Sequence, residues 1–535
     1  MMNRRRFIKG TAISVAAAAF SGSARAADKT VFADKSTHYK CLFNHELLIA
    51  IHNPDNNPQY VKSFITKLKD TDIDAVMCCP MAWRTNLYPS EIDLSRKKCS
   101  PNVTHPKFPA YDWAMKYLNS GGDFVRDTLE ACRESGKAFF ISYRMNDPHH
   151  VGDKDFPTHD DFWRENPHLL FGDSKVAFRA TDDARLFNYM HPEVRDHYFA
   201  ILKELALKYD IDGLELDFQR YPKYFYKRET EKGKLVMTDF VKRVRAMLDE
   251  IGKSRGKRLK LSVRIPHKLE LCSQAGLDPA AWDGTVDMAD ISSYYINTTE
   301  ADIESFKKLL PNVKIYGEIN YVTRQVKSSS GMQARRFTNV ETYRGTAFNY
   351  LSRGADGICL FNFDYIVDPN GWEDTVDKSS PSYVPLERRG SLAKEIKGIS
   401  DVEFLKRASK NYVINNRFDC LKKSDDEHVR IIIPDDTSRF KFSKAVLRVE
   451  TDKPCADLDI SASLNGTKLE MFEPSDTELF KPISVNEASA ARDCLKFYKV
   501  PLGKIICGEN TIDIKNLSAA KASRKYVSIE LGVYE

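Results

Sequence analysis

Short β-like runs alternate with longer helical stretches from residue 38 to about 366, and this alternation constrains the fold more than any other feature. Eight runs can be counted, and they are residues 41–45, 74–79, 138–146, 213–218, 259–266, 289–295, 314–320 and 357–363. Chains that alternate strand and helix build parallel sheets, and eight repeats are the number that closes a barrel. The first run is the weakest, since its surroundings can be divided differently. We predict an α/β chain with a (β/α)8 TIM barrel.

Two of the connecting stretches have the spacing of amphipathic helices. Residues 192–209 carry apolar side chains three and four positions apart, and Pro192 suits the first position of a helix. Residues 235–251 place Val236, Phe240 and Val244 on one stripe. We expect the first helix to cover the barrel just before its fourth strand, and the second to behave likewise.

After about residue 385 the pattern changes to short alternating runs without intervening helices, such as residues 428–434. The dipeptide Asn465-Gly466 is a strong hairpin signal. These features predict an all-β sandwich. The expected domains are therefore a barrel at residues 38–385 and an accessory β-sandwich at residues 386–535.

The N-terminus resembles a twin-arginine export signal. Arginines stand at positions 4, 5 and 6, a modest apolar run follows, and Ala24-Arg25-Ala26 has the form of a cleavage site. The alternative is a short membrane anchor, but the apolar run is too short to span a bilayer and no later segment approaches about 20 apolar residues. We expect a signal peptide at residues 1–27 and an exported protein, periplasmic or extracellular, without stable membrane insertion.

Charge and cysteine spacing argue against several classes of function. The formal net charge of +6 comes from 81 basic and 75 acidic residues, and part of the excess lies in the N-terminal arginines, which gives no case for a nucleic-acid partner. Eleven cysteines lack C-x-x-C spacing, so a zinc site is not expected. We predict mostly buried thiols, with the four C-terminal cysteines as the better disulfide candidates, and neither a metal nor a cofactor.

Residues 209–222 place two carboxylates on the fourth predicted strand. Strand residues alternate faces, so Leu214 and Leu216 point one way while Glu215 and Asp217 share the other. A strand covered on both sides is expected to be almost wholly apolar, and an unpaired buried carboxylate is costly. Two acids at this position therefore indicate a catalytic site.

The same anomaly recurs on other predicted strands, where polar residues occupy one face of an otherwise apolar run. These residues are Arg144 and Asn146, Glu215 and Asp217, Ser262 and Arg264, Tyr316, Glu318 and Asn320, and Asn362 and Asp364. Active sites of such barrels lie at the C-terminal ends of the strands. The residues together predict a polar pocket there that contains several acids.

Two carboxylates that flank a scissile bond are what glycoside hydrolysis requires. Asp217 and Glu318, from the fourth and seventh strands, are the preferred catalytic pair, and Asp364 is the reserve acid. Aromatic side chains can stack on sugar, and arginines can bind a carboxylate or sulfate on it. The expected substrate-binding residues are Arg144, Asn146, Asp147, His149, His150, Glu215, Arg220, Tyr221, Arg264, Tyr294, Tyr316 and Asn362.

Several of these residues also have plain structural interpretations. Glu215 and Arg264 can form a buried structural ion pair, and Asp212 before Gly213 is better explained as a turn residue. The adjacent His149 and His150 suggest a metal site, but neighbours at a strand end point apart, so substrate hydrogen bonding is the preferred interpretation.

Three segments in order resemble one family. RMNDPHH at 144–150, DGLELDFQRYP at 212–222 and the run from 262 to 295 look like bacterial glycoside-hydrolase-like (β/α)8 proteins of the group called glycosyl-hydrolase-like ten. The resemblance covers roughly residues 40–366 and implies a carbohydrate-active barrel, frequently followed by a β-sandwich. The positions carried over as pocket residues are Asp147, Glu215, Asp217 and Arg220.

The fourth strand also resembles the DGxDxDxE signature of family-18 chitinases, but Gln219 stands in place of the proton-donating acid and Glu215 in place of the middle aspartate. This departure argues against a substrate-assisted chitinase mechanism. The leading hypothesis is an exported glycoside hydrolase acting on a polysaccharide or glycoconjugate. The alternatives are a catalytically inactive carbohydrate-binding barrel and a metal-dependent hydrolase or lyase using Asp147, His149 and His150. Oligomeric state is left open.

Overall fold

The computed structural model describes most of the chain outside its N-terminal region. The described residues are 38–48, 58–95, 109–172, 183–294, 296–327, 333–363, 396–415, 426–452, 454–473, 494–518 and 525–535. The predicted signal peptide and the predicted domain boundary at residues 385 and 386 lie outside these ranges, as does Asp364. Across the described ranges, no helix combines the length and the apolar character that crossing a membrane needs.

Eight parallel strands close into a barrel in the order β1-β12-β9-β8-β7-β6-β5-β2. Their bounds are β1 Cys41–Glu46, β2 Ala75–Cys79, β5 Ala138–Arg144, β6 Gly213–Asp217, β7 Lys260–Pro266, β8 Met288–Ser292, β9 Lys314–Asn320 and β12 Gly357–Phe361. The predicted (β/α)8 barrel is therefore confirmed, including its weakest first strand. The sixth predicted run ends at Ser292 rather than at residue 295.

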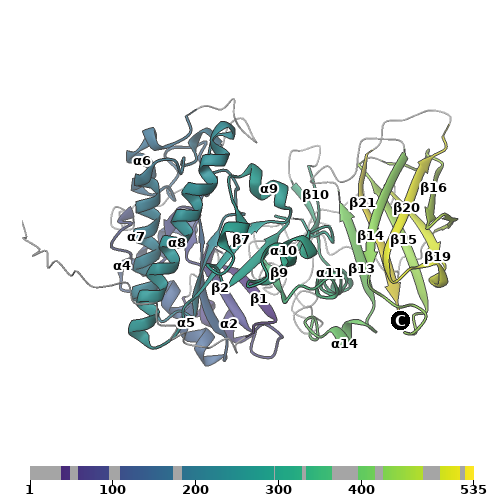
Figure 1. Cartoon of the computed structure of the whole chain (residues 1–535), viewed down its shortest axis with the longest axis horizontal. Helices are drawn as coiled ribbons and strands as arrows, with labels where there is room; N and C mark the ends of the chain where they lie inside the picture. The colour runs from purple at the N-terminus through teal and green to yellow at the C-terminus, as the bar shows by residue number, and fades with distance from the viewer. Residues whose placement is uncertain are drawn as a thin grey trace, which may run out of the picture. The chain divides into compact units, whose positions relative to one another are not determined.

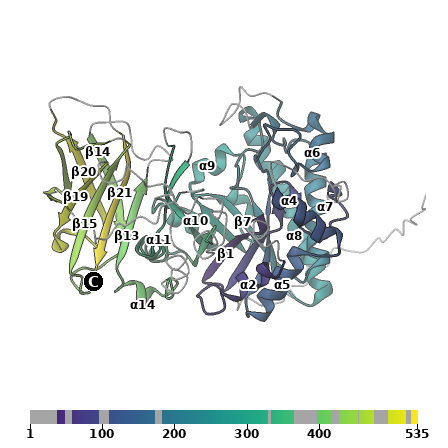
Figure 2. The same cartoon turned by 180° about the vertical axis from the view of Figure 1, so that it is seen from behind.

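Helices surround the barrel, as Figure 1 and the reverse view in Figure 2 show. Their bounds are α2 Gln59–Thr66, α4 Pro109–Asn119, α5 Phe124–Glu134, α6 Asp161–Glu165, α7 Pro192–Lys208, α8 Thr230–Arg255, α9 Leu269–Gln274, α10 Ile303–Leu309 and α11 Val340–Ser352. Both predicted helices are present, as α7 and α8. Pro192 occupies the first turn of α7, and Gly256, with a φ of 65°, ends α8 in the left-handed conformation.

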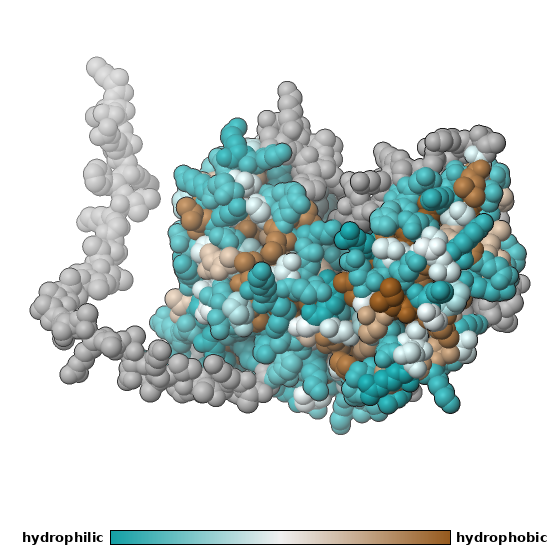
Figure 3. Space-filling model, turned by 45° about the vertical axis from the view of Figure 1, so that its right-hand side comes forward, coloured by the Kyte–Doolittle hydropathy of each residue, from teal (hydrophilic) through white to brown (hydrophobic). Residues whose placement is uncertain are grey.

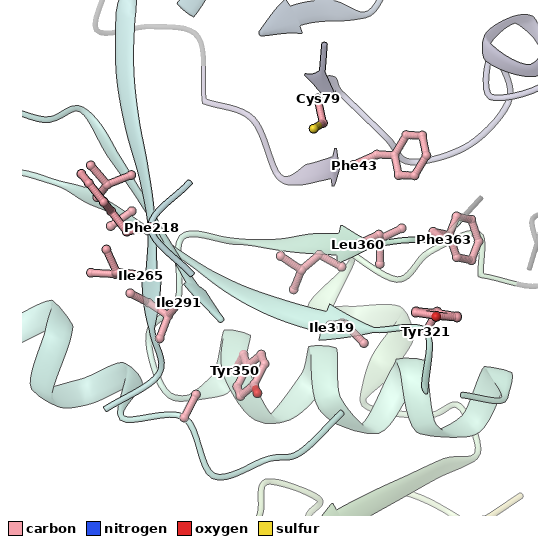
Figure 4. Packing of buried hydrophobic residues seen from close by; sticks show 14 of the residues in the cluster. Phe43, Cys79, Phe218, Ile265, Ile291, Ile319, Tyr321, Tyr350, Leu360 and Phe363 are labelled. Carbon is pink, nitrogen blue, oxygen red and sulfur yellow. The ribbon is translucent and has the colours of Figure 1, made fainter. Parts of the chain in front are cut away.

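Outward-facing strand residues form the apolar layer between barrel and helices. Leu214 and Leu216 of β6 belong to this core. Figure 4 shows Ile319 on β9 and Leu360 on β12 in the same layer, with Tyr350 from α11 nearby. A Cβ at Gly317 would lie 2.2 Å from the Tyr350 ring, so glycine at this position lets the helix approach the strand.

A separate apolar cluster fills the N-terminal end of the barrel. Its buried members are Tyr39, Leu42, Ala75, Met77, Phe140, Met288, Tyr316 and Cys359. Tyr316 donates from its hydroxyl to the Tyr39 carbonyl oxygen at 2.8 Å, directly before β1 begins. Side chains nearer the C-terminal end of the barrel are polar instead, and these carry the candidate site.

The C-terminal part forms two antiparallel sheets, ordered β13-β21-β15-β19-β18 and β14-β20-β16-β17. Their bounds are β13 Lys410–Asn415, β14 Asp426–Ile433, β15 Lys444–Thr451, β16 Ile460–Leu464, β17 Thr467–Lys468, β18 Glu470–Phe472, β19 Leu495–Val500, β20 Gly508–Asn516 and β21 Tyr526–Tyr534. Apolar residues of both sheets, such as Leu447 and Ile512, belong to one core. Asn465 and Gly466 both have positive φ in the β16–β17 hairpin, which confirms the predicted turn.

Strand β13 also lies against the barrel helix α11. A Cβ at Gly345 of α11 would lie 1.9 Å from the Asn411 carbonyl oxygen, and Thr299 donates from both its amide and its hydroxyl to the Val413 carbonyl oxygen at 3.0 Å. Smaller elements are the hairpin β3 Met81–Ala82 with β4 Thr85–Asn86, the hairpin β10 Val322–Lys327 with β11 Gln333–Phe337, and the helix α14 Val402–Leu405.

The described cysteines are free thiols, and only Cys507 among them is exposed. The expectation of mostly buried thiols is confirmed for the described cysteines other than Cys507, whereas Cys99 and Cys420 lie outside the described residues. On the face in Figure 3, hydrophobic residues are interspersed with hydrophilic ones.

Candidate active site

One guanidinium joins the two acids that the sequence selected as the catalytic pair. Arg264 on β7 donates from Nη1 to Asp217 Oδ1 at 2.9 Å and from Nε to Glu318 Oε2 at 2.5 Å. Side-chain exposure is 0% for Arg264, 3% for Asp217 and 0% for Glu318. Because a single guanidinium bridges them, the two carboxyl groups lie within the roughly 10 Å that glycosidase pairs span.

The two acids differ in how their oxygens are occupied. Oδ1 of Asp217 accepts three hydrogen bonds, one from the Arg264 side chain and two from the backbone N–H groups of Gln219 and Arg220. Among the described residues, no hydrogen bond to Asp217 Oδ2 is found. Glu318 uses both oxygens, since Oε1 accepts the Ser292 hydroxyl at 2.6 Å. Asp217 is therefore held by one oxygen, and Glu318 by two.

Glu215 lies on the same strand and face as Asp217, one step deeper in the barrel. Its two carboxylate oxygens accept hydrogen bonds from the Ser142 and Ser262 hydroxyls at 2.7 and 2.9 Å. Burial raises its pKa to about 7, and the nearby charge of Asp217 adds to this effect. The expected structural ion pair of Glu215 with Arg264 does not form, because Arg264 is engaged by Asp217 and Glu318.

Asp290 on β8 is a further acid in this cluster that the sequence reasoning missed. Its carboxylate is fully buried and has no nitrogen or hydroxyl donor among the described residues; its neighbours are the Cys359 thiol, which is a weak donor, and Arg264, whose Nε lies 3.9 Å from Oδ2. Burial, followed by the charges of Glu318 and Glu215, raises the pKa of Asp290 well above its ordinary value. The signal for it in the sequence is the alternation on β8, which places Asp290 on the same face as Met288 and Ser292.

A second charged network surrounds Arg144 at the end of β5. Arg144 pairs with Glu46 at the end of β1 and donates to Asp147 Oδ2 at 3.2 Å. Arg220 Nη1 lies 3.6 Å from the same Glu46 oxygen. Burial opposes ionisation of Glu46, but Arg144 and Arg220 together hold its pKa below the ordinary value. Glu46 was not predicted, because the first strand was assigned only to residue 45.

His149 connects Asp147 to Arg220. Its Nδ1 lies 2.7 Å from Asp147 Oδ1, and its Nε2 lies 2.8 Å from Arg220 Nη2. A guanidinium only donates, so Nε2 must accept and the ring proton belongs on Nδ1. Burial is the main cause of a lowered His149 pKa, and Arg220 adds to it. Both ring nitrogens are thus engaged within the protein.

His150 points away from this network. Its ring stacks on Phe156 with centroids 3.7 Å apart and lies edge-on to Trp83. The two histidine rings lie 6.3 Å apart, and both contact Trp83. Within the described part of the chain, no group of three or more His, Cys, Asp or Glu side chains is arranged to hold a metal ion.

The remaining predicted residues fall into three groups. Asn146 uses its amide to bind the backbone of Phe187 and Lys223, so it connects loops. Tyr221 and Tyr294 are partly exposed, and Tyr294 lies 5.9 Å from the Arg220 guanidinium. Tyr316 is a correction, because it lies in the apolar cluster at the N-terminal end of the barrel and does not join the site.

Left-handed backbone is concentrated after the barrel strands. Positive φ occurs at Trp83, which follows β2, at His150 after β5, at Tyr294 after β8 and at Asn362 directly after β12. Such conformations cost free energy outside glycine and cluster at functional sites. Trp83 was not predicted, and its indole stacks on His149 at 5.7 Å.

A small pocket lies beside this network, and Asp147 contributes to its wall. Arg84, Asp93, Asp160, His197 and Tyr198 also line it. Arg84 is buried and donates to the Asp147 carbonyl oxygen, and no partner for its Nε is found in the described part of the chain. Burial and the neighbouring Asp93 raise the pKa of Asp160 to about 6.

No protein-family model and no curated protein matches the chain significantly. Among solved structures, α-L-fucosidase isoenzyme 1 from Paenibacillus thiaminolyticus is 13% identical over 90% of this chain and 97% of its own, with a TM-score of 0.34. A glycoside hydrolase family 18 N-acetylglucosaminidase from Paenibacillus barengoltzii is 11% identical over 67% of this chain and 99% of its own, with a TM-score of 0.36. Chitinase ChiW from a Paenibacillus strain is 10% identical over 91% of this chain and 56% of its own, with a TM-score of 0.40. Likenesses this distant carry no conclusion about activity.

Proposed function

We propose that this chain is a glycoside hydrolase in which Asp217 is the reacting carboxylate. The observation that carries the proposal is the set of three hydrogen bonds to Oδ1 of Asp217, which fix the carboxylate while making no use of Oδ2. A carboxylate held in this way is oriented for attack by its other oxygen. Its position at the end of β6 matches the end of a barrel where active sites lie.

Hydrolysis with retention needs a second carboxyl group that first donates a proton to the leaving oxygen and then accepts one from water. Glu318 is the proposed partner, because Arg264 holds it next to Asp217. Asp364, which lies outside the described residues, is the reserve acid.

The proposal is tested by incubating the full chain with a library of polysaccharides and glycoconjugates and comparing wild type with Asp217→Asn, Glu318→Gln and Asp364→Asn. We expect the first variant to lose cleavage and one of the other two to lose it as well. Asp356→Asn is the matched control, since Asp356 is also ion-paired but stands next to Lys307 and Lys314, before β12. If wild type and Asp217→Asn release equal amounts of product, the proposal is wrong.

A second candidate is a carbohydrate-binding barrel without catalysis. It is favoured by Glu318, which is fully buried and accepts hydrogen bonds from Arg264 and Ser292 at its two oxygens, since the Arg264 guanidinium favours the ionised form and a general acid must carry a proton. Glycan binding without cleavage in the wild-type protein, unchanged by Asp217→Asn, would select this candidate.

Membership of the glycosyl-hydrolase-like ten group and export are further parts of the proposal. The first is supported by the three motif segments, and the second by the arginines at positions 4–6 followed by Ala24-Arg25-Ala26. Replacing the three arginines with lysine is expected to keep the protein inside the cell, as measured by fractionation. Unchanged export would contradict the assignment of a twin-arginine signal.

A further inference from the structure

Among the described residues, no hydrogen-bond partner is found for several side-chain amide atoms near the candidate site. The atoms are Gln219 Oε1, Asn297 Nδ2 and Oδ1, Asn320 Nδ2, Asn362 Oδ1 and Asn415 Oδ1. All five residues are at most 3% exposed. Leaving one buried polar atom unpaired costs about 1–3 kcal/mol, and native proteins pair the great majority of such atoms. A concentration of unpaired amides therefore points to a ligand.

Four of these amides lie at or after the C-terminal ends of barrel strands. Gln219 comes after β6, Asn297 after β8, Asn320 ends β9 and Asn362 comes directly after β12. The loop that contains Asn297 is bound to the end of β9 by two hydrogen bonds. The backbone N–H of Asn297 donates to the Val322 carbonyl oxygen at 2.7 Å, and the backbone N–H of Val322 donates to Asn320 Oδ1. Strand pairing of Asn320 with Phe361 sets Asn362 beside them.

Two further contacts connect the group to its surroundings. Gln219 donates from Nε2 to the carbonyl oxygen of Ser292, whose hydroxyl binds Glu318. Asn415, the last residue of β13, donates from Nδ2 to the Asn297 carbonyl oxygen. Gln219 is thus connected to Glu318 through Ser292, and Asn415 is connected to Asn297.

The arginines, by contrast, are already used. Arg144 is paired with Glu46 and Asp147, and Arg264 with Asp217 and Glu318. Arg220 lies against Glu46 and His149. Because Arg144 and Arg264 are engaged by carboxylates of the protein itself, their partners argue against a role for these two side chains in binding a carboxylate or sulfate on the sugar.

We propose that the amides of Gln219, Asn297, Asn320, Asn362 and Asn415 bind the hydroxyl groups of an uncharged sugar. Their unpaired atoms include both donors and acceptors, and a hydroxyl can serve both, whereas a sulfate or carboxylate only accepts. The inference rests on the proposed function and deepens it, because the substrate becomes a neutral glycan.

The test is a glycan-binding measurement on the full chain, using neutral oligosaccharides and matched oligosaccharides that carry uronic acid or sulfate. The background is Asp217→Asn, so that bound glycan is retained. Asn297→Leu removes an amide that makes no side-chain hydrogen bond, and Asn362→Gly keeps a residue suited to its φ of 51°. Thr346→Val on α11 is the control, since its hydroxyl is also buried and unpaired.

We expect binding to neutral glycans, weakened roughly 10-fold by Asn297→Leu and by Asn362→Gly, which corresponds to one lost hydrogen bond each. Thr346→Val is expected to bind as the background does, and Asn297→Leu to melt no earlier than it. Preference for acidic glycans, no glycan binding, or unchanged binding in both amide variants, as when the amides hold only water, would overturn the inference. If neutral glycans bind through the amides but wild type cleaves none, the hydrolase proposal fails and this inference stands.

Discussion

Arg264 on β7 donates to Glu318 on β9 over 2.5 Å, although strand β8 runs between them. The side chain therefore crosses β8, where it passes within 3.9 Å of Asp290 and donates to the Ser292 hydroxyl at 3.0 Å. The Arg264 guanidinium is thus the positive charge next to three buried carboxyl groups, those of Asp217, Asp290 and Glu318. We therefore expect the stability of the folded protein to depend on Arg264 and on the protonation of the acids around it.

Arg264→Met is expected to lower the free energy of unfolding by about 3–5 kcal/mol near neutral pH, because it leaves Asp217 and Glu318 buried without compensation. Urea unfolding measures the change. Arg258→Met is the control, since its ion pair with Asp287 is only partly buried, with the two side chains 36% and 20% exposed, and such a pair contributes about 0–1 kcal/mol. A loss at Arg264 no larger than the control would contradict the bridging role.

Glu215 is expected to make the protein less stable as pH rises. Its pKa in the folded state is about 7 against an ordinary 4.5, so the folded protein keeps a proton that the unfolded chain releases. Its contribution is complete below pH 4.5 and is lost as pH rises to about 7, by an amount on the order of 3 kcal/mol. Glu215→Gln removes this loss, so urea unfolding at pH 5 and pH 8 is expected to differ less in the variant than in wild type.

Asp356 is the control of opposite sign. Burial opposes its ionisation, but Lys307, Lys314 and the Ile315 amide hold its pKa below the ordinary 3.8, so its contribution is present above pH 3.8 and is lost in acid. Asp356→Asn is therefore expected to destabilise the protein more at pH 8 than at pH 3. Identical pH profiles for wild type and Glu215→Gln would show that Glu215 does not hold the proton.

His149 is expected to be neutral at pH 7 with its proton on Nδ1, because Asp147 accepts from Nδ1, Arg220 donates to Nε2, and its pKa is lowered. Imidazole nitrogen NMR of the folded protein measures both properties, with the urea-unfolded chain as reference. Added zinc is expected to leave these signals in place. A proton on Nε2, or a zinc-dependent shift, would revive the metal-dependent alternative.

Gly345→Ala is expected to destabilise the protein by about 1–3 kcal/mol or more, because the new Cβ would overlap the Asn411 carbonyl oxygen of β13. Thermal melting provides the measurement. Gly503→Ala is the control, since no atom lies within 4 Å of a Cβ placed there. If both variants melt alike, β13 does not pack on α11 as described.

Much of the architecture was predictable because strand and helix periodicities are local properties. All eight barrel strands, the helices α7 and α8 and the Asn465-Gly466 hairpin follow from spacing and turn residues. Alternation also assigned Glu215, Asp217, Arg264 and Glu318 to the inner face. It assigned Tyr316 to that face too, but depth along the barrel depends on how the strands are staggered, and Tyr316 proved to be at the opposite end.

The sequence by itself determined the number of strands and which face of each is polar, because both depend on residues close together in the chain. Only the tertiary structure decided which charged side chains contact one another. Arg264 reaches Glu318 across β8, Arg144 reaches Glu46 at the end of β1, and Asp290 is buried without a nitrogen or hydroxyl donor among the described residues. These pairings depend on barrel closure and on long side chains that cross strands, which no local pattern encodes.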